Sequence, residues 1–153
     1  MRRVGALIVV ALLLAACSSG VPVLTTSEAN VSSPIAGTAQ IAVAFINTGT
    51  ADDELLSVSS PLAAFIEIHE TVVTDGRAVM TKRESVPLSR GATVLFRPGS
   101  LHLMLLVPDA TVVTGARVPL TFTFATHPPI TVTADVVDLL DLVTFADSLE
   151  VGS

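Results

Sequence analysis

The sequence contains no Trp and no Tyr, and its aromatic residues are six Phe. Proteins that bind sugars or single-stranded nucleic acid usually stack the ligand on aromatic rings, so this scarcity argues against both classes. Positive charge is scarce as well: eight Lys and Arg stand against fourteen Asp and Glu, and the formal net charge is −6. A nucleic-acid partner is therefore not expected.

Cysteine is almost absent too. Because Cys17 is the only one, the chain cannot form an intramolecular disulfide, and its fold must be held by a hydrophobic core. An electron-transfer cupredoxin is also disfavoured, since its copper needs a Cys thiolate beside His and Met. Without a free Cys nucleophile or a recognisable Ser motif we find no catalytic constellation, and we do not expect an enzyme.

No apolar run is long enough to span a bilayer, which takes ~20 residues. The run Val4–Leu14 follows Arg2 and Arg3, which is the order of an export signal, so we predict a signal peptide over residues 1–16. The next residues, Leu14-Ala15-Ala16-Cys17 and then Ser18-Ser19-Gly20, resemble a bacterial lipobox. That resemblance implies lipidation of Cys17 and an extracytoplasmic, membrane-anchored location, in the periplasm or on the outer face of the cell membrane. The alternative is an ordinary cysteine near a conventional cleavage site.

The rest of the chain divides into three parts. Residues 17–37 mix Ser, Thr, Pro and Gly without a regular apolar period, which predicts a flexible tether. Residues 38–136 read as one all-β domain, a β-sandwich, because short β-rich runs alternate with turn residues. The runs are 39–47, 55–59, 65–74, 77–83, 93–97, 101–107, 118–125 and 130–136. Residues 137–153 form a C-terminal extension that begins as either a short amphipathic helix or a continued strand.

Four side chains that can bind a soft or borderline metal stand out within this domain. They are His69, Met80, His102 and Met104, and they use both methionines beyond the initiator. Imidazole and thioether together suit Cu(I), because a thioether is a neutral, polarisable donor. Two thioethers are poor donors for Zn²⁺, so a structural zinc site is not favoured. Singly, each Met could fill the core and each His could be a surface residue.

Strand geometry can bring these donors together. If Asp75-Gly76 is the two-residue loop of a hairpin, Met80 lies opposite Thr71 and His69 lies opposite Lys82. His69 and Met80 then become diagonal neighbours on one face, close enough for both to reach one ion. His102 and Met104 are two residues apart in one strand, so they also share a face.

Several segments resemble the extracytoplasmic copper chaperones of the PCu(A)C family. They are residues 45–49, 58–61, 66–71 and 98–105, with Met80 between the last two. The resemblance implies a cupredoxin-like Greek-key β-sandwich that binds one Cu(I) through His69, Met80, His102 and Met104. It further implies delivery to the CuA subunit of cytochrome c oxidase, often alongside a Sco-type thiol protein. Copper sequestration, or a binding or adhesion lipoprotein whose His and Met merely pack, is the alternative.

The chain departs from that family's pattern at two places. Glu70 follows the first histidine, where some members have a second Met, and the C-terminus carries no His or Met. We therefore expect one copper site and no second site in the tail. Of the remaining polar residues, His127 reads as a surface loop residue ahead of two prolines. Residues 52–54 read as a solvated acidic turn rather than a hard-cation site.

Overall fold

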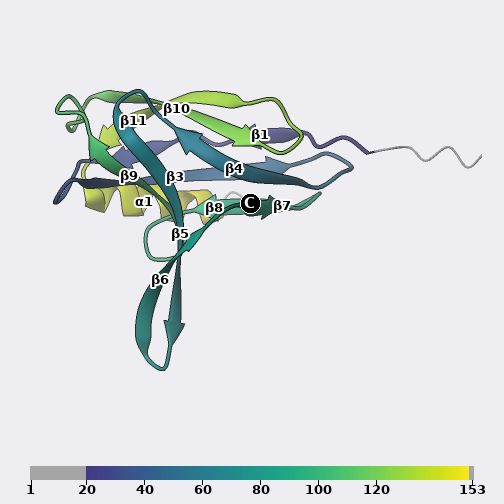
Figure 1. Ribbon diagram of the computed structural model, residues 1–153, viewed down its shortest axis with the longest axis horizontal. Helices are drawn as coiled ribbons and strands as arrows, with labels where there is room; N and C mark the ends of the chain where they lie inside the picture. Colours follow the sequence, from purple (N-terminus) through teal and green to yellow (C-terminus); the bar gives the residue numbers. More distant parts are fainter. Residues whose placement is uncertain (1–19, 152–153) are drawn as a thin grey trace, which may run out of the picture.

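The computed structural model describes residues 20–151, and most of this part of the chain is β-strand (Figure 1). The predicted signal peptide and Cys17 lie outside the described residues. The strands are β1 (Leu24–Thr26), β2 (Asn30–Ser32), β3 (Thr38–Asn47), β4 (Asp53–Ser59), β5 (Ala63–Thr74), β6 (Arg77–Arg83), β7 (Val86–Leu88), β8 (Thr93–Phe96), β9 (Leu101–Pro108), β10 (Arg117–Phe124) and β11 (Ile130–Val137). One helix follows, α1 (Leu139–Val151).

The strands pack as a closed sandwich. Their order is β6-β5-β9-β3-β2-β11-β10-β4-β7, and an additional pairing of β5 with β4 closes the ring. All pairings are antiparallel except that of β2 with β11. The predicted all-β, cupredoxin-like sandwich is confirmed, and the eight predicted runs match eight strands to within two residues at each end.

The core lies between the layers and is filled from alternate strand positions. β10 shows the pattern most clearly, since Val118, Leu120, Phe122 and Phe124 are buried while the residues between them are not. Phe45 lies at the centre, with its ring edge-on to Phe96, Phe122 and Phe124 at centroid separations of 5.8, 4.9 and 5.7 Å. Such edge-to-face pairs add to the stabilisation from burial.

The predicted tether over residues 17–37 is wrong for residues 24–32. Within this stretch Leu24–Thr26 form β1 and Asn30–Ser32 form β2. Both strands pair with β3, and Leu24, Ala29 and Val31 are part of the core. Two strands of three residues are too short to display a period of two, so the Ser and Thr around them dominate the sequence signal. The equally short β7 was missed for the same reason. The folded unit therefore starts well before residue 38.

Of the C-terminal extension, for which helix and strand were both open, Leu139–Val151 form the helix α1. Its first intrahelical bond runs from the Leu142 N–H to the Asp138 carbonyl, at 2.9 Å. Leu142 and Ala146 are one turn apart and so share a helix face. Both are buried against Ala42 on the outer side of β3. The small side chain of Ala42 lets the helix approach the sheet closely.

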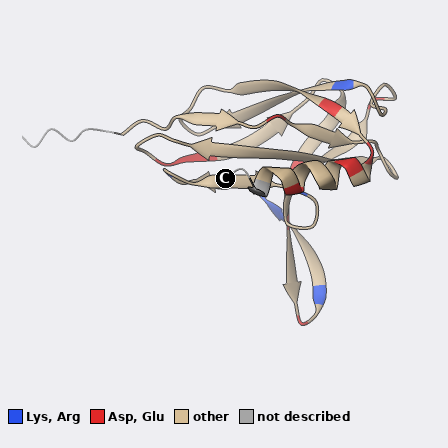
Figure 2. Cartoon of the chain, turned by 180° about the vertical axis from the view of Figure 1, so that it is seen from behind, with Lys and Arg blue, Asp and Glu red and all other residues tan. Residues whose placement is uncertain are grey.

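A long hairpin, β5–β6, projects from the sandwich (Figure 1). Asp75 and Gly76 form its loop with φ of 52° and 73°, as a two-residue turn of type I′ requires. The predicted register is confirmed: Met80 pairs with Thr71, and His69 pairs with Lys82. Every residue of β6 is exposed. Figure 2 shows Lys or Arg on β6 and an acidic residue at the tip of the hairpin.

Candidate metal centre

The four predicted metal ligands lie on three neighbouring strands, β6, β5 and β9. In the pairing of β5 with β9, His69 is directly opposite His102, and Met104 is opposite Glu67. Met80 pairs with Thr71, which is two residues from His69. Because side chains alternate along a strand, all four predicted ligands project from the same face. Their neighbours Ile68 and Leu103 point into the core, so this is the outer face of the sandwich.

The structure brings the two histidines together most closely. Their ring centroids are 5.8 Å apart and the ring planes are inclined by 56°. Met104 follows His102 on the same strand face, and Met80 is diagonal to His69 on the hairpin. The two methionines thus lie at opposite corners of the set, with the histidine pair between them. Met80 is 53% exposed, so its thioether is held by few contacts.

His102 is fixed by the backbone of its own strand. The side chain is 2% exposed, and its Nδ1 lies 2.8 Å from the Ser100 carbonyl oxygen. A carbonyl oxygen can only accept, so Nδ1 carries the hydrogen. In the neutral ring this leaves the lone pair on Nε2. A neutral imidazole with one nitrogen held by a backbone carbonyl is the usual arrangement of a metal-binding histidine.

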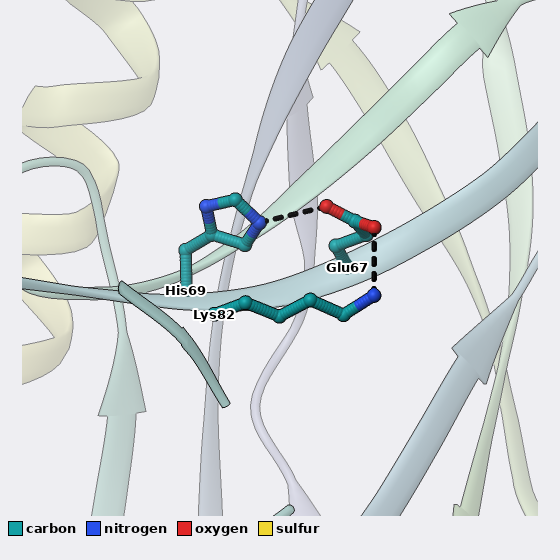
Figure 3. A network of polar contacts seen from close by, with 3 residues as sticks. All are labelled: Glu67, His69 and Lys82. Carbon is teal, nitrogen blue, oxygen red and sulfur yellow. Dashed lines mark hydrogen bonds and ion pairs between the residues drawn. The ribbon is translucent and has the colours of Figure 1, made fainter. Parts of the chain in front are cut away.

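His69 is held by side chains instead. Its Nε2 lies 2.8 Å from one carboxylate oxygen of Glu67, and the Lys82 ammonium lies 2.8 Å from the other. Figure 3 shows the chain of contacts, with the second ring nitrogen of His69 pointing away from Glu67. That nitrogen, Nδ1, is buried and has no hydrogen-bond partner among the described residues. A buried polar atom without a partner is costly, and it is an available donor for a metal ion.

Glu67 and Lys82, two charged residues beside His69, shift each other's pKa. Hydrogen bonds from Lys82 and then from His69 hold the pKa of Glu67 below its usual range, although burial opposes this. The hydrogen bond between Lys82 and Glu67 also raises the pKa of Lys82. Both groups are solvent-accessible, so their ion pair adds little to stability. Its main effect is to keep an ionised carboxylate beside the imidazole.

The geometry of the histidine pair fits a shared metal ion. An imidazole nitrogen binds a first-row metal at about 2 Å, so two rings on one ion have centroids about 5–6 Å apart. The observed separation is 5.8 Å. Among residues 20–151, no group of three or more His, Cys, Asp or Glu could hold a metal. A site on this face therefore needs Met as well as His, a donor set that suits a soft ion.

Sequence reasoning missed three polar neighbours of the site. Glu67 and Lys82 share the face of His69, and both could have been found: Glu67 is two residues before His69, and Lys82 lies opposite it in the predicted register. Gln40 is opposite Met104, and its side-chain oxygen is buried without a partner among the described residues. Its place depends on the long-range pairing of β3 with β9, which no local signal indicates.

The other polar residues considered have structural roles. The backbone N–H groups of Glu54, Thr126 and His127 all donate to the Asp53 carboxylate. Asp53 is buried, so the prediction of a fully solvated acidic turn is wrong at this residue. His127 lies in the loop after β10 as expected, with its ring edge-on to Phe124. Both lie at the start of β4, whereas the pairing of β4 with β5 is made by Val58, five residues further along the strand.

Among the solved structures that share the fold of this chain are copper-bound proteins. The copper-bound PCuAC domain from PmoF2 is 19% identical, covers 75% of this chain and 92% of that domain, and superposes with a TM-score of 0.63. Cu(I)-loaded DR1885 from Deinococcus radiodurans is 21% identical, with coverage of 80% and 83% and a TM-score of 0.63. At these identities the likeness establishes the fold, and it confirms that the fold implied by the PCu(A)C resemblance is correct.

Curated relatives match over a shorter stretch. "Putative lipoprotein Lxx21020" of Leifsonia xyli subsp. xyli is 29% identical over 80 residues, which is 52% of this chain and 48% of that protein. "Uncharacterized protein RP573" of Rickettsia prowazekii is 36% identical over 80 residues, which is 52% of this chain and 44% of that protein. The chain thus spans about half the length of these relatives.

A family match covers more of the chain than either relative. Residues 23–136, which run from β1 into β11, match the family described as "Putative lipoprotein LpqE-like". Within residues 20–151, no helix has the length and apolar character needed to cross a membrane. The match takes in nearly every strand and all four candidate ligands, and the chain therefore belongs to the LpqE-like lipoprotein family.

Proposed function

We propose that this protein is an extracytoplasmic Cu(I) carrier that binds one ion through His69, Met80, His102 and Met104. The observation that carries the proposal is the register of β6, β5 and β9, which puts two imidazoles and two thioethers on one face. Both histidines also keep one ring nitrogen out of the hydrogen bonds described above. The copper-bound PCuAC neighbours have the same fold, which supports the proposal.

The donor set suits delivery. A carrier must protect its ion from stray chemistry and still release it, and neutral thioethers without a thiolate bind Cu(I) less tightly than a thiolate-rich acceptor does. Transfer to such an acceptor would run downhill. We propose the CuA centre of cytochrome c oxidase as the acceptor, with a Sco-type thiol protein as a second partner. Attachment to the membrane would come from lipidation of Cys17, outside the described residues.

Anaerobic titration with Cu(I) against a competing chelator tests the binding step. Every strand, the helix and both buried clusters lie within residues 24–151, so a chain that starts at residue 18 keeps the folded unit and omits the only thiol. We expect one equivalent of Cu(I), with nitrogen and sulfur donors in its X-ray absorption spectrum. Met80→Leu and Met104→Leu should each remove a sulfur donor and weaken binding, whereas Val79→Leu on the opposite face should not.

If both methionine variants bind Cu(I) as tightly as the parent, the proposed carrier function is contradicted, and the alternative of a binding or adhesion lipoprotein is supported. A second measurement, of Cu(I) transfer to an acceptor, distinguishes delivery from sequestration. Mixing the Cu(I)-loaded protein with a metal-free CuA domain should lower the copper content of the carrier. Retention of the ion in the presence of excess acceptor would indicate sequestration.

A further inference from the structure

The two candidate histidine ligands offer different ring nitrogens. In His102, Nδ1 is held by the Ser100 carbonyl at 2.8 Å, so Nε2 is the available donor. In His69, Nε2 is held by the Glu67 carboxylate at 2.8 Å, and Nδ1 is the buried atom without a partner. The rings are neighbours across β5 and β9. Each ring thus has one anchored nitrogen and one open nitrogen, and the open positions are not the same.

Glu67 is itself held in place. Its backbone lies in β5, where it pairs with Met104 of β9. Its second oxygen accepts a hydrogen bond from Lys82, which is opposite His69 on β6. Glu67 is a poor candidate for a Cu(I) ligand for two reasons. Both of its carboxylate oxygens are already hydrogen-bonded, and a carboxylate is a hard donor, whereas Cu(I) is a soft ion. Glu67 is well placed to accept the Nε2–H of a neutral His69.

We propose that Glu67 is a positioning residue, which accepts the Nε2–H of His69 and so presents Nδ1 to Cu(I), while His102 binds the same ion through Nε2. The inference rests on the proposed copper site and specifies how it is organised. Carboxylates and backbone carbonyls behind metal-binding histidines fix the tautomer and raise the basicity of the ring. Here one histidine uses a carboxylate and the other a carbonyl.

Long-range proton–nitrogen NMR spectra of the chain from residue 18 test the assignment directly. With three histidines in the sequence, each ring can be assigned by a His→Gln variant. In the metal-free protein, His69 should carry its hydrogen on Nε2. On addition of Cu(I), which is diamagnetic, the Nδ1 signal of His69 and the Nε2 signal of His102 should shift. The ring of His127, in the loop after β10, serves as the internal control.

Variants of Glu67 separate a positioning role from a merely structural one. Glu67→Gln keeps only one side-chain oxygen, and the Lys82 ammonium would compete for it, so this variant is made in a Lys82→Leu background. There the oxygen can accept the Nε2–H, and the tautomer of His69 and the Cu(I) affinity should stay close to those of Lys82→Leu alone. Glu67→Leu removes the acceptor and should mix the two tautomers of His69 and lower the affinity about tenfold or more. Glu70→Gln is the matched control, because Glu70 pairs with Arg83 on the other face.

The outcomes for the site and for Glu67 are distinct. A shift of His69 Nε2 in place of Nδ1 would overturn the positioning role and leave the copper site standing. The positioning role would also be overturned if the Glu67→Leu variant had the same His69 tautomer and the same Cu(I) affinity as the parent. If neither His69 nor His102 responds to Cu(I), the proposed function itself fails. Circular dichroism of each variant checks that the fold is intact, and the metal-free tautomer is a readout that does not depend on copper.

Discussion

Asp53 and Asp109 are single carboxylates that fix turns of the backbone in this protein. Asp53 is buried and accepts three backbone N–H groups at the ends of β4 and β10. Asp109, just after β9, accepts the N–H and the hydroxyl of Thr111 at 2.9 and 2.7 Å. The pKa of Asp109 is lowered by the hydroxyl first and the backbone N–H second. Bonds to the charged form favour ionisation, which explains the direction.

We expect Thr111→Val to raise the pKa of Asp109 toward its ordinary value, because the hydroxyl donor is lost and only the backbone donor remains. A carboxylate with a lowered folded-state pKa contributes stability that is present above its unfolded pKa and is lost as pH falls through the folded pKa. The variant should therefore lose less stability on acidification. Carbon-detected NMR titration of the carboxyl group measures the shift, with Thr81→Val on β6 as the control. An unchanged pKa would show that the hydroxyl has no part in it.

At the scale of the element, the face of a strand decides which donors can meet. Val79 and Met80 are adjacent on β6, so their side chains project from opposite faces. The double variant Val79→Met, Met80→Val keeps the composition and moves the thioether to the other face. We expect it to bind Cu(I) as weakly as Met80→Val alone, and its X-ray absorption spectrum should show one sulfur donor fewer.

The single variant Val79→Met is the matched control for that exchange, since it keeps Met80 and adds a thioether on the wrong face. Its affinity should equal that of the parent. If the double variant binds as tightly as the parent, then the register of β6 does not select the ligand and Met80 is not bound through the face described.

The helix α1 is attached to the sandwich through a small buried cluster. Leu142 is fully buried against Ala42, whereas Leu140 on the same helix is 76% exposed. Leu142→Ala should lower the free energy of unfolding by about 2–4 kcal/mol through lost burial and a residual cavity. Leu140→Ala should change it by no more than about 0.5 kcal/mol. Urea denaturation of the two variants makes the comparison, and equal values would mean that α1 does not pack on β3 in solution.

Local signals predicted those elements whose pattern is complete within the segment. β10 alternates over eight residues, and the Asp75-Gly76 turn sets the register of β5 and β6, so both were predicted correctly. β1, β2 and β7 have three residues each, too few for a pattern. α1 could not be decided because its residues suit helix or strand, and the deciding contact is Ala42, about a hundred residues earlier.

The candidate site was predictable in part for the same reason. That His69 and Met80 share a face follows from one turn, and that His102 and Met104 share a face follows from one strand. The alignment of His69 with His102 depends on pairing between β5 and β9, whose partner choice is set by closure of the whole sandwich. The open Nδ1 of His69 depends in turn on Glu67 and Lys82. These features appear only when distant strands are assembled.

At the scale of the whole molecule, a closed sandwich supports an arm with few contacts. The strands from β5 around to β4 each pair with at least two other strands, and their inward residues form one core. Within residues 20–151, the distal part of the β5–β6 hairpin has no third strand beside it, and all of β6 is exposed. His69, His102 and Met104 belong to the rigid part, and Met80 belongs to the arm. An ion bound by all four would join the two.

We therefore expect Cu(I) to protect the arm selectively. Stability against local opening is lowest where few apolar contacts are buried and backbone hydrogen bonds are exposed to water. In the metal-free protein, amides of β6 should exchange with solvent deuterium faster than those of β3 and β10. Loading with Cu(I) should slow exchange in β6 and around the Asp75-Gly76 turn, because opening of the arm would then require loss of the Met80 bond.

The Met80→Leu variant should still show fast exchange in β6 when copper is added, since its arm has no bond to the ion. Protection that rises equally in β6, β3 and β10 would mean that the ion stabilises the fold as a whole without joining the arm to the sandwich, and Met80 would then lose its place among the ligands.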